Sequence, residues 1–182
     1  EVIMAMTLIT TNNHSGDSDT TSSFTSSIDS TYKLYIFKFI NIHPQTDETE
    51  LTFQVNASDA TGYNETMTTT CFRAHHSEDD STTALSYDDS RDQAQGTSFQ
   101  KLSSQTGNGA DENLSGTLWL FNPSNTTYVK HFYARTNNYY SENHSYDSFI
   151  SGYINETTGI DDVQFKMSSG NINGVIKMYG VG

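Results

Sequence analysis

One stretch, Tyr32–His43 (YKLYIFKFINIH), restricts the fold more than any other part of the chain. Successive side chains of a β-strand point to opposite faces, so a strand buried on one face alternates apolar and polar residues. Here both alternate sets are mostly apolar. One set holds Tyr32, Leu34, Ile36, Ile40 and Ile42, and the other holds Tyr35, Phe37 and Phe39. The stretch, which Pro44 ends, therefore predicts a central strand covered on both sides.

Short segments of the same kind recur along the chain, separated by polar turns. Residues 50–56 alternate cleanly, with Leu51, Phe53 and Val55 on one face. The other predicted strands cover residues 66–74, 98–102, 117–121, 127–134, 148–154, 163–167 and 175–179. No segment has the apolar period of an amphipathic helix longer than a turn or two. The pattern predicts an all-β fold, an antiparallel, jelly-roll-like β-sandwich of about eight strands with long polar loops.

The apolar residues also predict the domain organisation. Residues 10–30 contain only two sizeable apolar side chains, Phe24 and Ile28, so residues 1–30 are expected to form a loosely packed N-terminal arm or linker. Residues 31–182 are expected to form a single β-sandwich domain, in which residues 75–98 are long acidic loops. Its predicted core contains Leu34, Ile36, Phe37, Phe39, Leu118, Trp119, Leu120, Phe132 and Phe165.

Composition agrees with this fold class and excludes several functions. Ser, Thr and Asn make up 63 of the 182 residues, a bias typical of strands joined by polar turns. The net charge of −13 argues against nucleic acid as a partner, because the surface repels phosphates. The single cysteine, Cys71, excludes an intramolecular disulfide and is expected to be a small buried residue in a strand. No apolar run is long enough for a membrane span.

The sequence contains no pattern that predicts catalysis, a cofactor or a metal. His75–Asp80 is the densest group of potential metal ligands, but adjacent strand residues face opposite ways, so His75 and His76 are not expected to share an ion. His43 and His131 are interpreted as structural residues rather than as bases. The chain is therefore predicted not to be an enzyme, with no catalytic, cofactor-binding or metal-binding residues.

Two further segments require an interpretation. Tyr139–Tyr146 (YYSENHSY) is expected to join two strands, and Tyr139, Tyr140 and Tyr146 are the candidate ligand-binding residues, because tyrosines among amides suit stacking on sugars or a protein interface. The alternative is a loop whose tyrosines only cover the sandwich edge. Ser168–Gly174 (SSGNING) lacks the Lys and the following helix of a phosphate-binding loop, so it is expected to be the turn of a terminal hairpin.

Several of these segments resemble a family of tailed-bacteriophage virion proteins common in viruses of marine bacteria. The likeness spans roughly residues 31–182. It is carried by Phe37–Pro44 (FKFINIHP), Ser115–Ser124 (SGTLWLFNPS), Val129–Phe132 (VKHF), Gly152–Asn155 (GYIN) and Phe165–Ile172 (FKMSSGNI).

The resemblance implies a non-enzymatic structural protein on the surface of a virus particle, assembled in the host cytoplasm. It would be a tail fibre or spike domain or a capsid decoration protein. The implied partners are other virion proteins and further copies of the chain, with a trimer favoured. The alternative function is that of a carbohydrate-binding module that recognises a host surface glycan.

Overall fold

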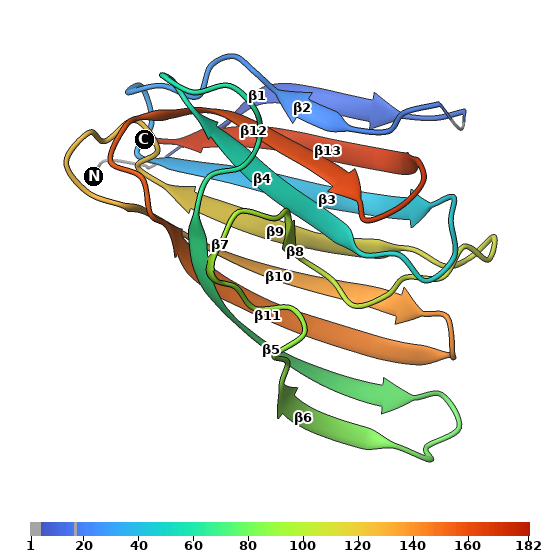
Figure 1. The fold of residues 1–182 in the computed structure, drawn as a ribbon. Helices are drawn as coiled ribbons and strands as arrows, with labels where there is room; N and C mark the ends of the chain where they lie inside the picture. Colours follow the sequence, from blue (N-terminus) through green and yellow to red (C-terminus); the bar gives the residue numbers. More distant parts are fainter. Residues whose placement is uncertain (1–4, 17) are drawn as a thin grey trace.

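The computed structural model describes residues 5–16 and 18–182, and this part of the chain contains strands but no helix (Figure 1). Most strands form one large antiparallel sheet. Its order is β1 (Met6–His14), β13 (Ile172–Val181), β3 (Leu34–Pro44), β9 (Leu114–Phe121), β10 (Lys130–Tyr140), β11 (His144–Ile154), β5 (Met67–Ser77) and β6 (Thr83–Tyr87), and the short β7 (Ala94–Gly96) also pairs with β5.

A smaller antiparallel sheet packs on one face of the large sheet. Its strands, in order, are β2 (Ser22–Phe24), β12 (Ile160–Met167), β4 (Leu51–Ala57) and β8 (Gln100–Lys101). Figure 1 shows β12 and β4 crossing over the part of the large sheet that contains β13 and β3. The described residues therefore form a sandwich of two unequal sheets, and the predicted all-β antiparallel sandwich is confirmed. The finer jelly-roll assignment stays a prediction.

Aromatic rings from both sheets meet in the core. The ring of Phe165 in β12 lies 5.2 Å from the rings of both Phe37 and Phe39 in β3, and Phe53 in β4 lies 4.8 Å from Phe132 in β10. All five side chains are buried. Because rings of this size bury a large apolar area, these contacts between the sheets are a principal source of stability.

The predicted core is correct for six of its nine members. Phe37, Phe39, Leu118, Leu120, Phe132 and Phe165 belong to the buried cluster between the sheets. Ile36 is buried outside that cluster, while Leu34 and Trp119 are partly exposed. These three occupy the alternate positions of β3 and β9, which point away from the small sheet. The prediction that β3 is central is confirmed, since it pairs with β13 and β9, but the predicted cover on both of its faces is wrong.

The N-terminal region differs from the expected loose arm. Of residues 1–30, the described part contains β1 at the edge of the large sheet and β2 at the edge of the small one. Phe24 and Ile28 are buried in the common core. These two side chains and the partly buried Ile9 anchor the segment, and backbone pairing with β13 and β12 supplies further contacts.

Two expected connections are also corrected. Residues 75–98 contain the end of β5 together with β6 and β7, rather than long loops alone. Ser168–Gly174 does not close a hairpin, because β12 and β13 belong to different sheets and the chain crosses between them here. The glycines still serve the expected purpose: Gly170 and Gly174 have φ values of 72° and 114°, which few other residues adopt.

Candidate functional site

The large sheet has an outer face, defined here as the face that points away from the small sheet. No other described strand lies over it, and several apolar side chains on it are in contact with solvent. Phe72 is 44% exposed, Tyr133 47% and Tyr87 57%. Soluble domains rarely leave large neighbouring apolar side chains open to water without a binding partner. The outer face is therefore a candidate binding surface.

Four aromatic residues from four neighbouring strands form what we call the aromatic platform: Phe72 in β5, Phe149 in β11, Tyr133 in β10 and Trp119 in β9. The rings of Phe72 and Phe149 are stacked 4.7 Å apart. The rings of Trp119 and Tyr133 lie 5.0 Å apart with a tilt of 34°. The register explains both contacts, because each pair occupies directly opposite positions on adjacent strands.

A shallow groove of about 290 Å³ lies between these rings, and Arg135 and Ser151 line it as well. The guanidinium of Arg135 lies 4.7 Å from the centre of the Phe149 ring. Two hydrogen bonds to Asp147, of 3.0 and 2.7 Å, fix its orientation. The groove thus combines apolar ring surfaces with a small number of oriented polar groups, which is the usual composition of a small-molecule site.

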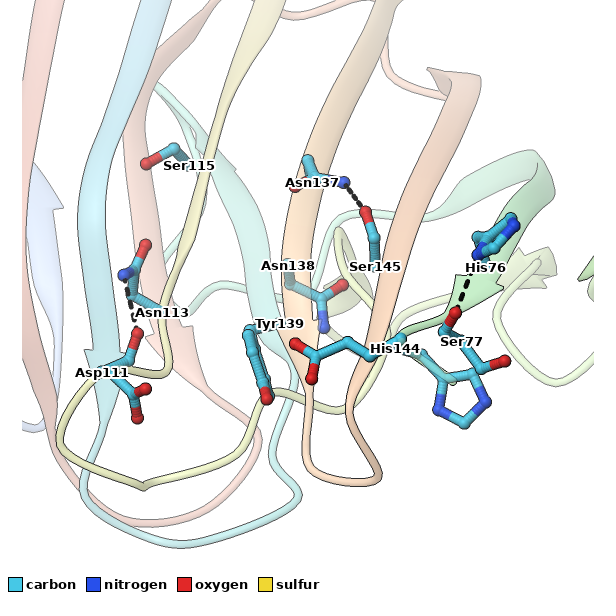
Figure 2. Close-up of a pocket in the computed structure, with 11 residues that line it drawn as sticks. His76, Ser77, Asp111, Asn113, Ser115, Asn137, Asn138, Tyr139, His144 and Ser145 are labelled. Atoms are coloured by element: carbon cyan, nitrogen blue, oxygen red, sulfur yellow. Dashed lines mark hydrogen bonds between the residues drawn. The ribbon is translucent and has the colours of Figure 1, made fainter. Parts of the chain in front are cut away.

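A second hollow, of about 530 Å³, lies at the end of the same sheet where β10 joins β11 (Figure 2). Figure 2 shows Asp111 and Asn113 on one side of Tyr139, and Ser77 and His144 on the other. Asn137 donates a hydrogen bond of 3.0 Å to the hydroxyl of Ser145 in its wall. We call this hollow the polar pocket. Its hydroxyl, amide and imidazole groups suit a ligand that carries many hydroxyls.

The three candidate tyrosines are not brought together. Tyr139 lines the polar pocket, and burial and the neighbouring Glu78 carboxylate raise its pKa. Tyr140 and Tyr146 lie on the opposite side of the strands, with their rings 4.9 Å apart. The expected loop is wrong, because β10 continues to Tyr140 and β11 begins at His144. All three tyrosines are therefore in strands, where alternation determines the face that each one occupies.

Tyr146 is buried and belongs to a cluster of aromatic and basic groups whose other members are partly exposed. The His75 imidazole stacks on its ring at 4.9 Å, and the Arg73 guanidinium lies 4.9 Å from the same ring. Burial is the main cause that lowers the pKa of His75, and the positive charges near it, His144 and Arg73, act in the same direction. The cluster joins β5 to β11 and favours a neutral His75.

Beside this cluster lies a buried ionic network. Asp88 accepts a hydrogen bond from Arg91, and its carboxylate is 3.2 Å from the Arg73 guanidinium. Arg91 is also 3.7 Å from Glu50, which pairs with Lys101 at 3.1 Å. Asp88, Arg91 and Glu50 are each less than a tenth exposed. Paired charges of this kind attach the segment after β6 to the body of the sandwich, and none of them opens into either hollow.

Cys71 and the histidines show no arrangement for nucleophilic or metal chemistry in the described residues. The thiol of Cys71 is buried in β5, as expected, and burial raises its pKa to about 11, so it is protonated near neutral pH. His75 and His76 lie on opposite sides of β5, as predicted. Within residues 5–16 and 18–182, no three His, Cys, Asp or Glu side chains are grouped as metal ligands.

Comparisons with known proteins do not identify the chain: no family model, curated protein or solved structure matches it. The described residues also contain no helix with the length and apolarity needed to cross a bilayer.

The sequence does not predict the aromatic platform. Each of its residues occurs in a separate segment, and only the register of four strands places them together. A signal was nevertheless present in residues 117–121, where Leu118 and Leu120 alternate with Trp119 and Phe121. Because both sets are apolar, this strand has a second apolar face, which is either a further core layer or a binding surface.

Proposed function

We propose that the protein is a non-catalytic carbohydrate-binding domain that holds a glycan chain across the outer face of the large sheet. The observation that supports this proposal is the aromatic platform on a sheet face that no other described strand covers. Sugar rings have apolar faces that stack on aromatic side chains and hydroxyl edges that hydrogen-bond to polar groups. The platform and its rim offer both kinds of contact.

The outer face also has the shape that an extended chain of sugars requires. Tyr133, Arg135, Asn137 and Tyr139 alternate along β10 and point to the same side. At roughly 3.4 Å per residue, these positions span about 20 Å, from the aromatic platform to the polar pocket. A glycan lying along β10 would stack on the platform and place its hydroxyls among the amides and hydroxyls of the pocket.

Binding to immobilised glycans tests the proposal. The wild-type protein is expected to bind a subset of polysaccharides, and a Trp119→Ala, Tyr133→Ala double variant is expected to lose this binding. Tyr63→Ala is the matched control, because Tyr63 contacts Phe99 and lies near Asp162 of β12, away from the platform. Equal binding by the wild type and the double variant, or no binding by the wild type, would overturn the proposal.

The exposed aromatic side chains of the same face are also the kind that contact another copy of a chain. Sedimentation equilibrium with and without the Trp119→Ala, Tyr133→Ala substitutions distinguishes the two occupants. Self-association that these substitutions abolish, without any glycan binding by the wild type, would replace the carbohydrate proposal by an oligomer interface.

A place on a virus particle stays a prediction that rests on the sequence resemblance. It is compatible with carbohydrate binding, since a domain displayed on a particle can recognise a surface glycan. Immunogold electron microscopy of intact particles tests it: label on the tail favours adsorption, label on the capsid favours decoration, and no label excludes both. The favoured trimer is tested by the sedimentation experiment.

A further inference from the structure

Two lysines lie side by side on the outer face, next to the aromatic platform. Lys38 in β3 and Lys177 in β13 occupy directly opposite positions in the antiparallel pair. Like charges at such positions repel each other and destabilise a sheet. Neither lysine forms an ion pair with a carboxylate in the described part of the chain. Among the described residues, the two lysines therefore form a positive pair without a carboxylate partner.

Lys38 is directed towards the platform. Its ammonium donates a hydrogen bond of 3.0 Å to the hydroxyl of Thr117 in β9, and lies 5.9 Å from the centre of the Trp119 ring. A sugar ring stacked on Trp119 would thus have one edge within reach of a positive charge. Lys177, one strand further away, extends the same positive region across the sheet.

The position of these lysines is notable because the chain has only nine Lys and Arg residues against 22 acids. Most of the other cations are engaged: Arg73, Arg91, Lys101 and Arg135 pair with carboxylates, and buried Lys130 donates to the carbonyl groups of Glu156 and Thr158. Repulsion from the acidic surface is screened beyond about 10 Å at ordinary salt, so an anion at the platform mainly senses the charges close to it.

We infer that the glycan bound at the platform is acidic, and that Lys38 and Lys177 bind the anionic group of a sugar that stacks on Trp119. This inference rests on the proposed carbohydrate function and adds the ligand class. Carboxylate and sulfate groups present the same chemistry to an ammonium, which accepts either as a point charge.

Two measurements test the inference. On an array that carries neutral, uronate-bearing and sulfated polysaccharides, the wild type is expected to bind charged members, and the members that bind show whether the anionic group is a carboxylate or a sulfate. Calorimetry then compares one uronic-acid hexasaccharide with the same compound after reduction of its carboxyl groups; for a sulfated ligand the matched compound is the desulfated one. The charged form is expected to bind roughly tenfold tighter or more, as a charge-assisted contact requires.

The variants separate this inference from the proposed function. Lys38→Gln with Lys177→Gln is expected to bind the charged and neutral forms equally, whereas Trp119→Ala loses both. Lys166→Gln, on the small sheet against Phe99, is the control and should keep the preference for charge. Binding of neutral glycans without any preference for charge, or a preference that survives in the double lysine variant, would overturn the inference and leave the proposed function intact. No glycan binding at all would overturn both.

Discussion

The rings of Phe72 and Phe149 lie face to face on the outer side of the large sheet, with their centroids 4.7 Å apart and their planes 5° from parallel. They come from adjacent strands, β5 and β11, and Phe72 remains 44% exposed. The Arg135 guanidinium covers the Phe149 ring, and two hydrogen bonds to Asp147 hold it in place. Aromatic surface is thus held rigidly in contact with water, which is the arrangement of a binding surface rather than of a core.

Replacing Phe149 should therefore affect binding more than folding. We expect Phe149→Ala to weaken glycan binding by about tenfold, or ~1.4 kcal/mol, because it removes one wall of the groove and the surface on which Arg135 rests. Isothermal titration calorimetry measures the affinity. If Trp119→Ala abolishes binding but Phe149→Ala leaves the affinity unchanged, the binding site includes only the half of the platform that contains Trp119.

Trp119 and Phe165 separate the outer face from the core in a stability measurement. Phe165→Ala is expected to lower the free energy of unfolding by about 3–5 kcal/mol, because the ring is fully buried among Phe24, Phe37 and Phe39. Trp119→Ala should cost about 1–2 kcal/mol, because the indole is partly exposed and contacts Tyr133 and Lys38 on the outer face. Urea unfolding at equilibrium compares the two. Equal losses in the free energy of unfolding would mean that Trp119 is a core residue, as its sequence context predicts.

This contrast shows what the sequence predicts well. The apolar run Tyr32–His43 predicts β3, and its period of two places Phe37 and Phe39 on one face, where both lie in the core. The cover on both sides could not be predicted, because an apolar residue that faces a ligand has the same identity as one that faces a second layer. For this reason the sequence predicts a core position for residues such as Ile36 and Trp119.

The sequence predicts the candidate site only in part, because it does not show which side of the sheet each tyrosine occupies. The connection between β10 and β11 has three residues rather than eight, so Tyr139 and Tyr140 are both in β10. Strand alternation then places their side chains on opposite sides of the hairpin. The platform is harder still, since it requires the pairing of β9, β10, β11 and β5. Local sequence does not encode which distant strands become neighbours, whereas each strand's own alternation is visible in its residues.

The network around Asp88 should be essential to stability at neutral pH. Burial alone would raise the pKa of Asp88, but the hydrogen bond from Ser90 and the charges of Arg91 and Arg73 outweigh it and hold the pKa below its ordinary value of 3.8. Asp88→Asn leaves Arg91 buried beside a neutral partner, and we expect a loss of about 3–5 kcal/mol in the free energy of unfolding.

The pH dependence provides the control for this variant. A carboxyl group whose pKa is lower in the folded state stabilises the protein above its unfolded pKa, and this contribution disappears as the pH falls through the folded pKa. The difference in the free energy of unfolding between the wild type and Asp88→Asn should therefore be constant near neutral pH and shrink below about pH 3.8. A difference that does not change with pH would mean that the carboxylate charge is not responsible.

His75 should make the fold sensitive to mild acid. Its pKa in the folded protein lies below the ordinary 6.5, chiefly because of burial and then because of the charges of His144 and Arg73. Below pH 6.5 the unfolded chain takes up a proton more readily than the folded one, so stability should fall as the pH drops from there through the folded pKa. Denaturant unfolding at several pH values measures this slope.

His75→Phe keeps the ring that stacks on Tyr146 and removes the titrating group, so we expect a smaller loss of stability in mild acid. The same substitution at His131, which lies exposed on the outer face, is the control and should keep the wild-type slope. If His75→Phe and the wild type lose stability equally between about pH 6.5 and pH 5, the acid sensitivity arises at another residue.

An added side chain at Gly174 should destabilise the fold. Gly174 lies in β13 and not in the turn that its sequence context predicts. It has a φ of 114° at an irregularity in the pairing of β13 with β3, and a Cβ there would lie 2.4 Å from the carbonyl oxygen of Asn41. We expect Gly174→Ala to cost about 1–3 kcal/mol from backbone strain, with the steric contact adding to it. Gly16→Ala is a matched control, because Gly16 has a φ of 83° but nothing within 4 Å of the added carbon. Thermal unfolding that ranks Gly16→Ala as the more damaging change would contradict the close approach of β3 and β13 at this point.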